Sequence, residues 1–231
     1  MAVLGQRVRP DQWDERTSGA AIYTTDVVLP QMLEARILRS PHPHADIRGI
    51  DTSRAEALGG VAAVITADDL PDRAYLHLGE PFSDRSPLAR DRVRFIGEEV
   101  AAVAARTRAD ADSALDLIDV DYKPRESVVT AQFARVSQAP TVHDDATGNL
   151  SLQTVRSYGN PDTARSEAEV VVSGHYTYKP AAHVCLEPHS TVARWDPARQ
   201  HLDLWVSTQA PYFVRKEVAH MLDLDMDQVR T

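Results

Sequence analysis

The spacing of apolar and polar side chains predicts strands, short loops and helical turns over the first half of the chain. Residues 22–40 are predicted to be extended, because apolar and polar positions alternate along their second half and prolines bound that half. Shorter strands are predicted at 46–50 and 61–66, and the second is almost wholly apolar, as a buried strand would be. A helical turn capped by Thr52 or Ser53 lies between them, so the pattern predicts a strand–helix–strand unit of the βαβ type.

A buried strand and an amphipathic helix follow a long polar loop. The loop is predicted at 68–91, which is rich in Pro, Asp, Ser and Arg. The apolar run at 100–105 predicts the strand, and Thr107 is placed to cap the helix. The expected apolar stripe of this helix consists of Ala111, Ala114, Leu115 and Ile118. A further strand begins at Val120, and Pro124 ends it.

Alternation of apolar and polar side chains over 168–178 predicts a long strand in the second half of the chain. Residues 191–195 and 202–207 are predicted to pair as a hairpin across the turn at 196–199. Pro211 suits the first position of a helix. The expected apolar face of this helix consists of Phe213, Val214, Val218, Met221 and Leu222. The residues after it resemble the start of another strand, so we expect an incomplete second domain.

These elements predict an α+β protein of two domains. A polar lead-in at 1–19 precedes a mixed first domain at 20–126. An irregular connector at 127–160 then leads to the second domain, which is expected over 161–231. With 231 residues, the chain is long enough for each domain to bury a core of its own.

Composition and charge exclude several classes of function. The chain is 43% apolar and 26% charged, which is typical of a soluble globular protein. Its net charge is −9 and it has no basic run, so nucleic acid is not expected as a partner. No apolar run approaches the roughly 20 residues that cross a bilayer, and we expect a cytoplasmic protein that does not contact membranes. The single cysteine, Cys185, excludes an internal disulfide and a cysteine-rich metal site.

Chemically versatile side chains crowd into one short stretch of the second half. His183, Cys185, Glu187 and His189 occupy every second position there. An extended backbone would place all four on one face, whereas a helix would bring His183 and Glu187 together at positions i and i+4. The alternative is a polar strand edge beside a core. Spacing by itself leaves both interpretations open.

Seven sequence segments follow one another in a characteristic order along the chain. The first half contains VLGQRVRP, IYTTDVVLPQMLEARILRSPHPHADIRGIDTS, GVAAVITADDL, VRFIGEEVAAV and VDYKP. The second half contains LEPHSTVARWD and LWVSTQAPYFVR. Together they resemble the start of the large subunit of the molybdenum hydroxylases, a family that includes xanthine dehydrogenase, aldehyde oxidase and carbon monoxide dehydrogenase. The resemblance runs from Val3 to the last residue.

The resemblance implies an α/β hammerhead domain over 20–126, followed by the first part of a molybdenum-cofactor-binding domain. It implies an oxidoreductase that oxidises an aldehyde, an N-heterocycle or a related small substrate with oxygen taken from water. The expected cofactor is molybdenum bound to molybdopterin, shared with the remainder of the subunit. Iron–sulfur clusters and FAD are expected on partner subunits of a hetero-oligomer. Because the family's glutamate base and pterin-binding glycines belong beyond Thr231, we expect a split-gene subunit or a truncated product that is inactive alone.

The resemblance also implies candidate site residues. The family often places a glutamine near the apical oxo ligand of molybdenum, just ahead of the LE dipeptide, where this chain has Ala181, Ala182 and His183. His183 is the candidate to replace that glutamine, in catalysis and in cofactor binding. Glu187 is a second catalytic candidate, either to position a neighbour or as a base whose pKa burial would have to raise. Gln209 is a candidate cofactor contact, or else a strand-end residue that satisfies backbone groups of the next helix.

Two hypotheses of other classes stay open. A non-catalytic scaffold or assembly module derived from the family would explain a chain without the family's base and pterin-binding glycines. A small metallohydrolase would use His183, Glu187 and His189 as ligands, although these lack the helical H-E-x-x-H spacing. Under the family hypothesis no side chain of this chain is expected to ligate a metal.

Overall fold

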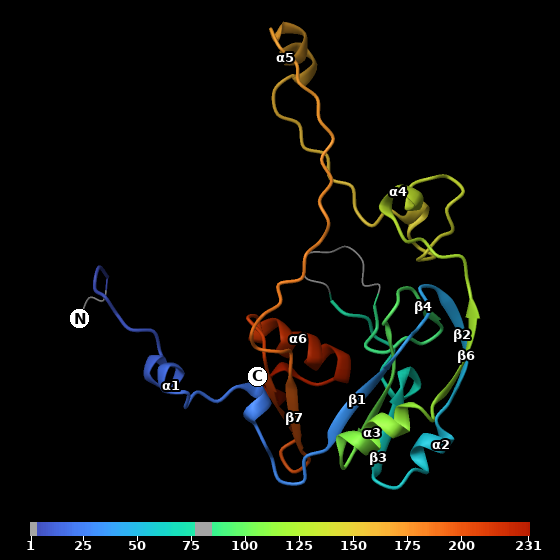
Figure 1. The fold of residues 1–231 in the computed structure, drawn as a ribbon, viewed down its shortest axis with the longest axis vertical. Coiled ribbons are helices and arrows are strands. Elements are labelled where there is room, and N and C mark those ends of the chain that lie inside the picture. Colours follow the sequence, from blue (N-terminus) through green and yellow to red (C-terminus); the bar gives the residue numbers. More distant parts are fainter. Residues whose placement is uncertain (1–3, 77–84) are drawn as a thin grey trace. The chain divides into compact units, whose positions relative to one another are not determined.

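The computed structural model describes residues 4–76 and 85–231, so 77–84 of the predicted loop lie outside the described residues. The described chain divides into two compact units. One unit is formed by 4–76, 85–125 and 187–231, and the other by 126–186. Every helix in the described residues is too short or too polar to cross a bilayer. Figure 1 shows the elements in chain order.

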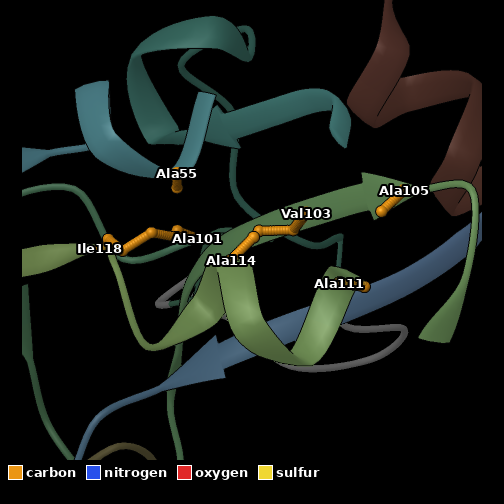
Figure 2. Packing of buried hydrophobic residues seen from close by; sticks show 7 residues of the cluster. All are labelled: Ala55, Ala101, Val103, Ala105, Ala111, Ala114 and Ile118. Carbon is orange, nitrogen blue, oxygen red and sulfur yellow. The ribbon is translucent and has the colours of Figure 1, made fainter. Parts of the chain in front are cut away.

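The first sheet has strand β5 (Glu99–Ala105) at its centre, between β1 (Glu34–Arg39) and β3 (Val61–Thr66). Both pairings are antiparallel. Helix α3 (Arg108–Leu115) packs on β5, and Thr107 caps it as predicted, because the threonine side chain accepts a hydrogen bond from the Asp110 N–H. Figure 2 shows the resulting core, which consists of Ala55, Ala101, Val103, Ala105, Ala111, Ala114 and Ile118. Small side chains on both elements let the helix approach the sheet closely.

A second antiparallel sheet has β2 (Ala45–Asp51) at its centre, with β4 (Arg92–Val93) and β6 (Asp119–Pro124) beside it. Its core consists of Ala45, Ala89, Val93 and Val100. Because Val100 lies on β5 of the first sheet, both sheets contribute to this cluster. The strand that Pro124 ends is confirmed as β6.

The predicted βαβ unit is wrong, because β2 and β3 belong to different sheets. The helix between them, α2 (Ser53–Glu56), has only four residues. A crossover between parallel strands needs about a dozen residues or more, which this connection lacks. The prediction that 61–66 is buried is also wrong, since β3 is an edge strand and Ile65 is exposed.

The predicted hairpin is confirmed as β7 (Thr191–Asp196) and β8 (His201–Val206). Helix α6 (Pro211–Leu222) follows, and β9 (Val229–Arg230) then pairs in parallel with β8. The parallel strand–helix–strand unit of the chain is therefore found here, with a core of Leu202, Ala219 and Val229. The predicted face of α6 is confirmed at Met221, which is buried. It is wrong at Phe213 and Leu222, which are exposed, and it lacks Ala219, which is buried.

The unit at 126–186 has little regular structure. Its helices are α4 (Ala131–Ala134), the 3-10 turn η3 (Thr147–Asn149) and α5 (Pro161–Glu167). The Asn149 side chain organises the first part of this unit through three hydrogen bonds. It accepts one from the Val142 N–H at 2.8 Å and donates the others to the carbonyl oxygens of Pro140 and Ala134. The predicted strand at 168–178 is wrong for this chain, because no described residue pairs with it as a strand.

Four short helical elements complete the described chain. The extended segment predicted at 22–40 is a strand only in β1, and a 3-10 turn occupies part of its first half. The remaining elements are α1 (Trp13–Ser18) and the 3-10 turns η1 (Thr24–Asp26), η2 (Ala67–Asp69) and η4 (Met226–Gln228).

Candidate functional site

The three candidate site residues are all exposed. His183 lies in the unit at 126–186, whereas Glu187 and Gln209 lie in the other unit. Within the described residues none of their side chains makes a hydrogen bond or an ion pair. Each side chain can therefore still donate hydrogen bonds to a bound group or accept hydrogen bonds from it.

Ser207 brings the segments that carry Glu187 and Gln209 to the same end of the β7–β8 hairpin. The Ser207 Oγ accepts a hydrogen bond from the Ser190 N–H at 2.8 Å and lies 3.1 Å from the carbonyl oxygen of Pro188. The Ser207 N–H donates to the carbonyl oxygen of Ser190 at 3.2 Å, which extends the antiparallel pairing by one residue beyond β7 and β8. Sequence analysis missed Ser207, although it stands directly ahead of the predicted candidate segment.

The stretch that carries Gln209 is fixed on both sides. Ser207 anchors it to the hairpin, and helix α6 begins immediately after it, with Pro211 at its first turn. The Ala210 N–H donates to Thr208 Oγ1 at 3.0 Å, which satisfies a backbone group at the entry to α6. Gln209 itself does not satisfy the helix backbone, which was the structural alternative for this residue.

A charged cluster joins the three strands of this sheet. Asp203 at the centre of the sheet lies directly opposite Arg194 on β7 and Arg230 on β9. Its Oδ2 lies 2.6 Å from Arg194 Nη2, and its Oδ1 lies 2.8 Å from Arg230 Nε. The hydrogen bond from Arg194 lowers the pKa of Asp203, and the charge of Arg230 acts in the same direction. The buried carboxylate thus binds the three strands to one another.

A loop of the first half of the chain binds helix α6. The Leu76 N–H donates to Glu217 Oε2 at 3.0 Å, and Arg73 binds the last turn of the helix. Between them, burial raises the pKa of the Tyr75 hydroxyl. Residues 73–76 of the predicted loop therefore bind the helix that follows Gln209, a contact that polar composition alone could not reveal.

The predicted alternating face of His183, Cys185, Glu187 and His189 does not form, because the stretch contains no strand or helix. Among the described residues no three His, Cys, Asp or Glu side chains come together as metal ligands. The metallohydrolase hypothesis therefore gains no support. A cavity of about 320 Å³ exists within 126–186, lined mainly by small and apolar side chains, and none of the candidate residues borders it.

Family comparisons connect this geometry to known proteins. A family described as aldehyde oxidase and xanthine dehydrogenase, a/b hammerhead domain, matches residues 18–126. A second, described as molybdopterin cofactor-binding domain, matches residues 142–231, which include all three candidate residues. The chain belongs to the molybdenum hydroxylase family. The predicted fold, a hammerhead domain followed by the beginning of a molybdenum-cofactor domain, is confirmed.

Two named relatives of this molybdenum hydroxylase chain are large subunits. It is 34% identical over 229 residues to the nicotinate dehydrogenase large molybdopterin subunit of Eubacterium barkeri, covering 99% of this chain and 52% of that protein. It is 35% identical over 217 residues to the carbon monoxide dehydrogenase large chain of Afipia carboxidovorans, covering 88% of this chain and 27% of that one. The chain thus spans about half of the first relative and less than a third of the second.

Solved structures agree with this assignment. The crystal structure of quinoline 2-oxidoreductase from Pseudomonas putida 86 matches with a TM-score of 0.87 and 29% identity, over 99% of this chain and 30% of that chain. A carbon monoxide dehydrogenase structure matches with a TM-score of 0.81 and 31% identity, over 97% and 30% of the two chains. The hydroxylase chain therefore folds as the N-terminal region of these longer subunits.

The free side chains fit the molybdenum cofactor as hydrogen-bond partners but not as metal ligands. Taken separately, each in its own unit, the Gln209 amide and the His183 imidazole are able to donate a hydrogen bond, and each is exposed and unpaired within the described chain. No described cluster could ligate the metal itself.

Proposed function

We propose that this chain forms the N-terminal part of the large subunit of a molybdopterin-dependent hydroxylase or dehydrogenase. The domains would be a hammerhead domain at 20–126, a connector at 127–160 and the first part of the molybdopterin-binding domain at 161–231. The observation that carries this proposal is the match of two successive family domains to 18–126 and 142–231. Relatives named for nicotinate, nicotine and xanthine support an N-heterocycle or a related small molecule as substrate.

The proposed partners are the remainder of the molybdopterin subunit, an iron–sulfur subunit and an FAD subunit in the cytoplasm. When bound, the molybdenum cofactor would supply the redox chemistry that oxidises a substrate carbon with oxygen from water. His183 would donate a hydrogen bond to an oxygen atom at the metal, and Gln209 would hold the cofactor from the strand end that Ser207 anchors. Glu187 would position a neighbouring group or accept a proton from a water molecule.

The test is purification of the tagged protein from its own source, followed by measurement of metals, flavin and catalysis. We expect stoichiometric molybdenum, together with iron and FAD on co-purifying chains. With nicotinate, quinoline, xanthine or an aldehyde as substrate in ¹⁸O-labelled water, we expect a product that carries the label. Partner chains without molybdenum would overturn the proposal in favour of the scaffold. Stoichiometric zinc without molybdenum would overturn it in favour of a hydrolase.

A further inference from the structure

The carboxylate of Glu217 binds a backbone group of the hammerhead domain. Its Oε2 accepts a hydrogen bond from the Leu76 N–H at 3.0 Å, although the two residues are 141 positions apart. Within the described part of the chain the Glu217 side chain makes no other hydrogen bond and no ion pair. Both residues belong to the same compact unit. The single bond of this charged side chain therefore joins helix α6 to the first domain.

The segment that carries Leu76 is bound to the central strand of the first sheet. The Tyr75 N–H donates to the carbonyl oxygen of Arg85 at 2.9 Å, and the Arg85 guanidinium donates to Glu99 Oε2 at 2.5 Å. Arg39 of β1 donates to the other oxygen of Glu99 at 2.7 Å. Burial raises the pKa of Glu99, but the hydrogen bonds from Arg85 and Arg39 outweigh it and lower the pKa. An ionised Glu99 on β5 thus fixes the backbone beside Leu76.

The apolar core beneath α6 leaves the exact position of the helix to its polar contacts. The helix contributes only the buried Ala219 and the partly buried Val218 to that cluster. Apolar contacts are non-directional, whereas a hydrogen bond depends on distance and angle. The bonds of Glu217 with Leu76, and of the His220 carbonyl with Arg73, therefore determine how the helix is rotated and how far it is shifted along the sheet.

The position of α6 in turn decides where Gln209 lies. Gln209 stands between Ser207, which is anchored to the hairpin, and Pro211, at which the helix begins. The helix rises about 9 Å between Pro211 and Glu217, and so short a helix moves as a rigid body. A displacement at Glu217 therefore moves Pro211, while Ser207 stays with the hairpin. The strand end that carries Gln209 has to absorb the difference.

We infer that Glu217 is a positioning residue for Gln209, and that the hammerhead domain orients this part of the cofactor site through the Leu76 N–H. The inference rests on the proposed function, because it requires Gln209 to contact the molybdenum cofactor. The carboxylate acts through helix α6 and not by touching the cofactor or the substrate. Outer groups that orient the groups in contact with a metal centre typically change metal affinity or activity by about 10- to 100-fold when they are removed.

Hydrogen–deuterium exchange on the purified complex tests the first contact. In Glu217→Ala the Leu76 amide should exchange about tenfold faster, because its acceptor is gone. Glu217→Gln should restore slow exchange, since the side-chain amide oxygen can accept the same bond. Lys216→Ala is the matched control on the same helix and should change nothing. Protected β8 amides in every variant would show that the chain still folds, and an unchanged Leu76 amide in Glu217→Ala would overturn the inference.

The rate at which the complex loses molybdenum during dialysis tests the action on Gln209. Glu217→Ala and Gln209→Ala should each lose the metal about tenfold faster than the unaltered complex, and Glu217→Gln and Lys216→Ala should not. The double variant should lose it no faster than Gln209→Ala alone, because Glu217 acts through that residue. Multiplied effects in the double variant would overturn the inference, since Glu217 would then act independently of Gln209.

The same measurement separates this inference from the proposed function. An unaltered complex without molybdenum would overturn the proposed function, and the role of Glu217 with it. A molybdenum-containing complex that oxidises its substrate, and that keeps its metal equally well in Glu217→Ala or in Gln209→Ala, would overturn only the positioning role.

Discussion

Arg73 and Asp223 lie 150 residues apart in the sequence, and their side chains form an ion pair in which Nη2 of Arg73 donates to Oδ1 of Asp223 over 2.5 Å. Nη1 of the same guanidinium donates to the carbonyl oxygen of His220 over 2.8 Å. Asp223 has left-handed backbone angles and ends helix α6. One arginine therefore binds the last turn of the helix, where positive charge is favourable.

Arg73→Ala should lower the free energy of unfolding by about 1 kcal/mol, measured by urea titration. A double-mutant cycle with Asp223→Ala should give a coupling energy of roughly 0.2–1 kcal/mol, because the Asp223 side chain is 72% exposed and water screens the pair. Arg16→Ala on the exposed helix α1 is the control and should change little. A zero coupling energy would show that Arg73 acts only through the His220 carbonyl.

Gly60→Ala should destabilise the protein by about 1–2 kcal/mol in thermal or urea unfolding. The φ angle of Gly60 is +98°, and a Cβ atom there would lie 2.7 Å from the Asp110 Oδ2. The neighbouring Gly59→Ala is a matched control, since a Cβ atom at Gly59 would have no atom within 4 Å and the φ of Gly59 is not left-handed. Equal effects of the two substitutions would contradict this assignment of strain.

Val103→Ala should lower the free energy of unfolding by about 2 kcal/mol. Val103 is 1% exposed in the core beneath α3, and truncating its side chain leaves a cavity. Leu115→Ala should lower the free energy of unfolding by only about 1 kcal/mol, although it removes more atoms than Val103→Ala does. The reason is that Leu115 is only partly buried against the same cluster. Chemical unfolding of the two variants at one pH checks the order. A larger loss for Leu115→Ala would mean that this helix face is buried more deeply than the structure shows.

Asp203→Asn should lower the urea midpoint at pH 7, and the difference from the unaltered protein should disappear in acid. The folded pKa of Asp203 lies below its unfolded value of about 3.9, because Arg194 and Arg230 favour the carboxylate. The carboxylate therefore stabilises the fold fully above that unfolded value, and this contribution is lost as the pH falls through the lower folded pKa. A difference that persists below the lowered folded pKa, where the carboxyl group is protonated in both states, would point to a steric effect of the amide.

His183→Ala in the assembled enzyme should slow turnover by roughly 100-fold with little change in KM, as expected when one preorganised donor is removed from a dry site. This expectation rests on the proposed function. His183→Gln should recover part of the rate, and His189→Ala is a neighbouring control that should not change it. Unchanged turnover in His183→Ala with normal molybdenum content would place the residue outside the reaction.

The sequence by itself determined the elements whose signals lie within one short window. Thr107 three residues before Asp110 marks the start of α3, and the turn at 196–199 between two alternating stretches marks the hairpin. These features depend on hydrogen bonds and side-chain periods among near neighbours, so they hold wherever the element packs. The family assignment likewise followed from phrases read in order along the chain.

Only the tertiary structure decided which strands pair and which polar groups meet. The placement of β2 and β3 in different sheets, and the meeting of Asp203 with Arg194 and Arg230, depend on contacts between distant segments. An alternating pattern predicts that a strand has two different faces. It does not predict which backbone segment will pair with that strand. At 168–178 the alternation is present, yet no strand forms among the described residues, because a strand exists only when a second backbone satisfies its N–H and C=O groups.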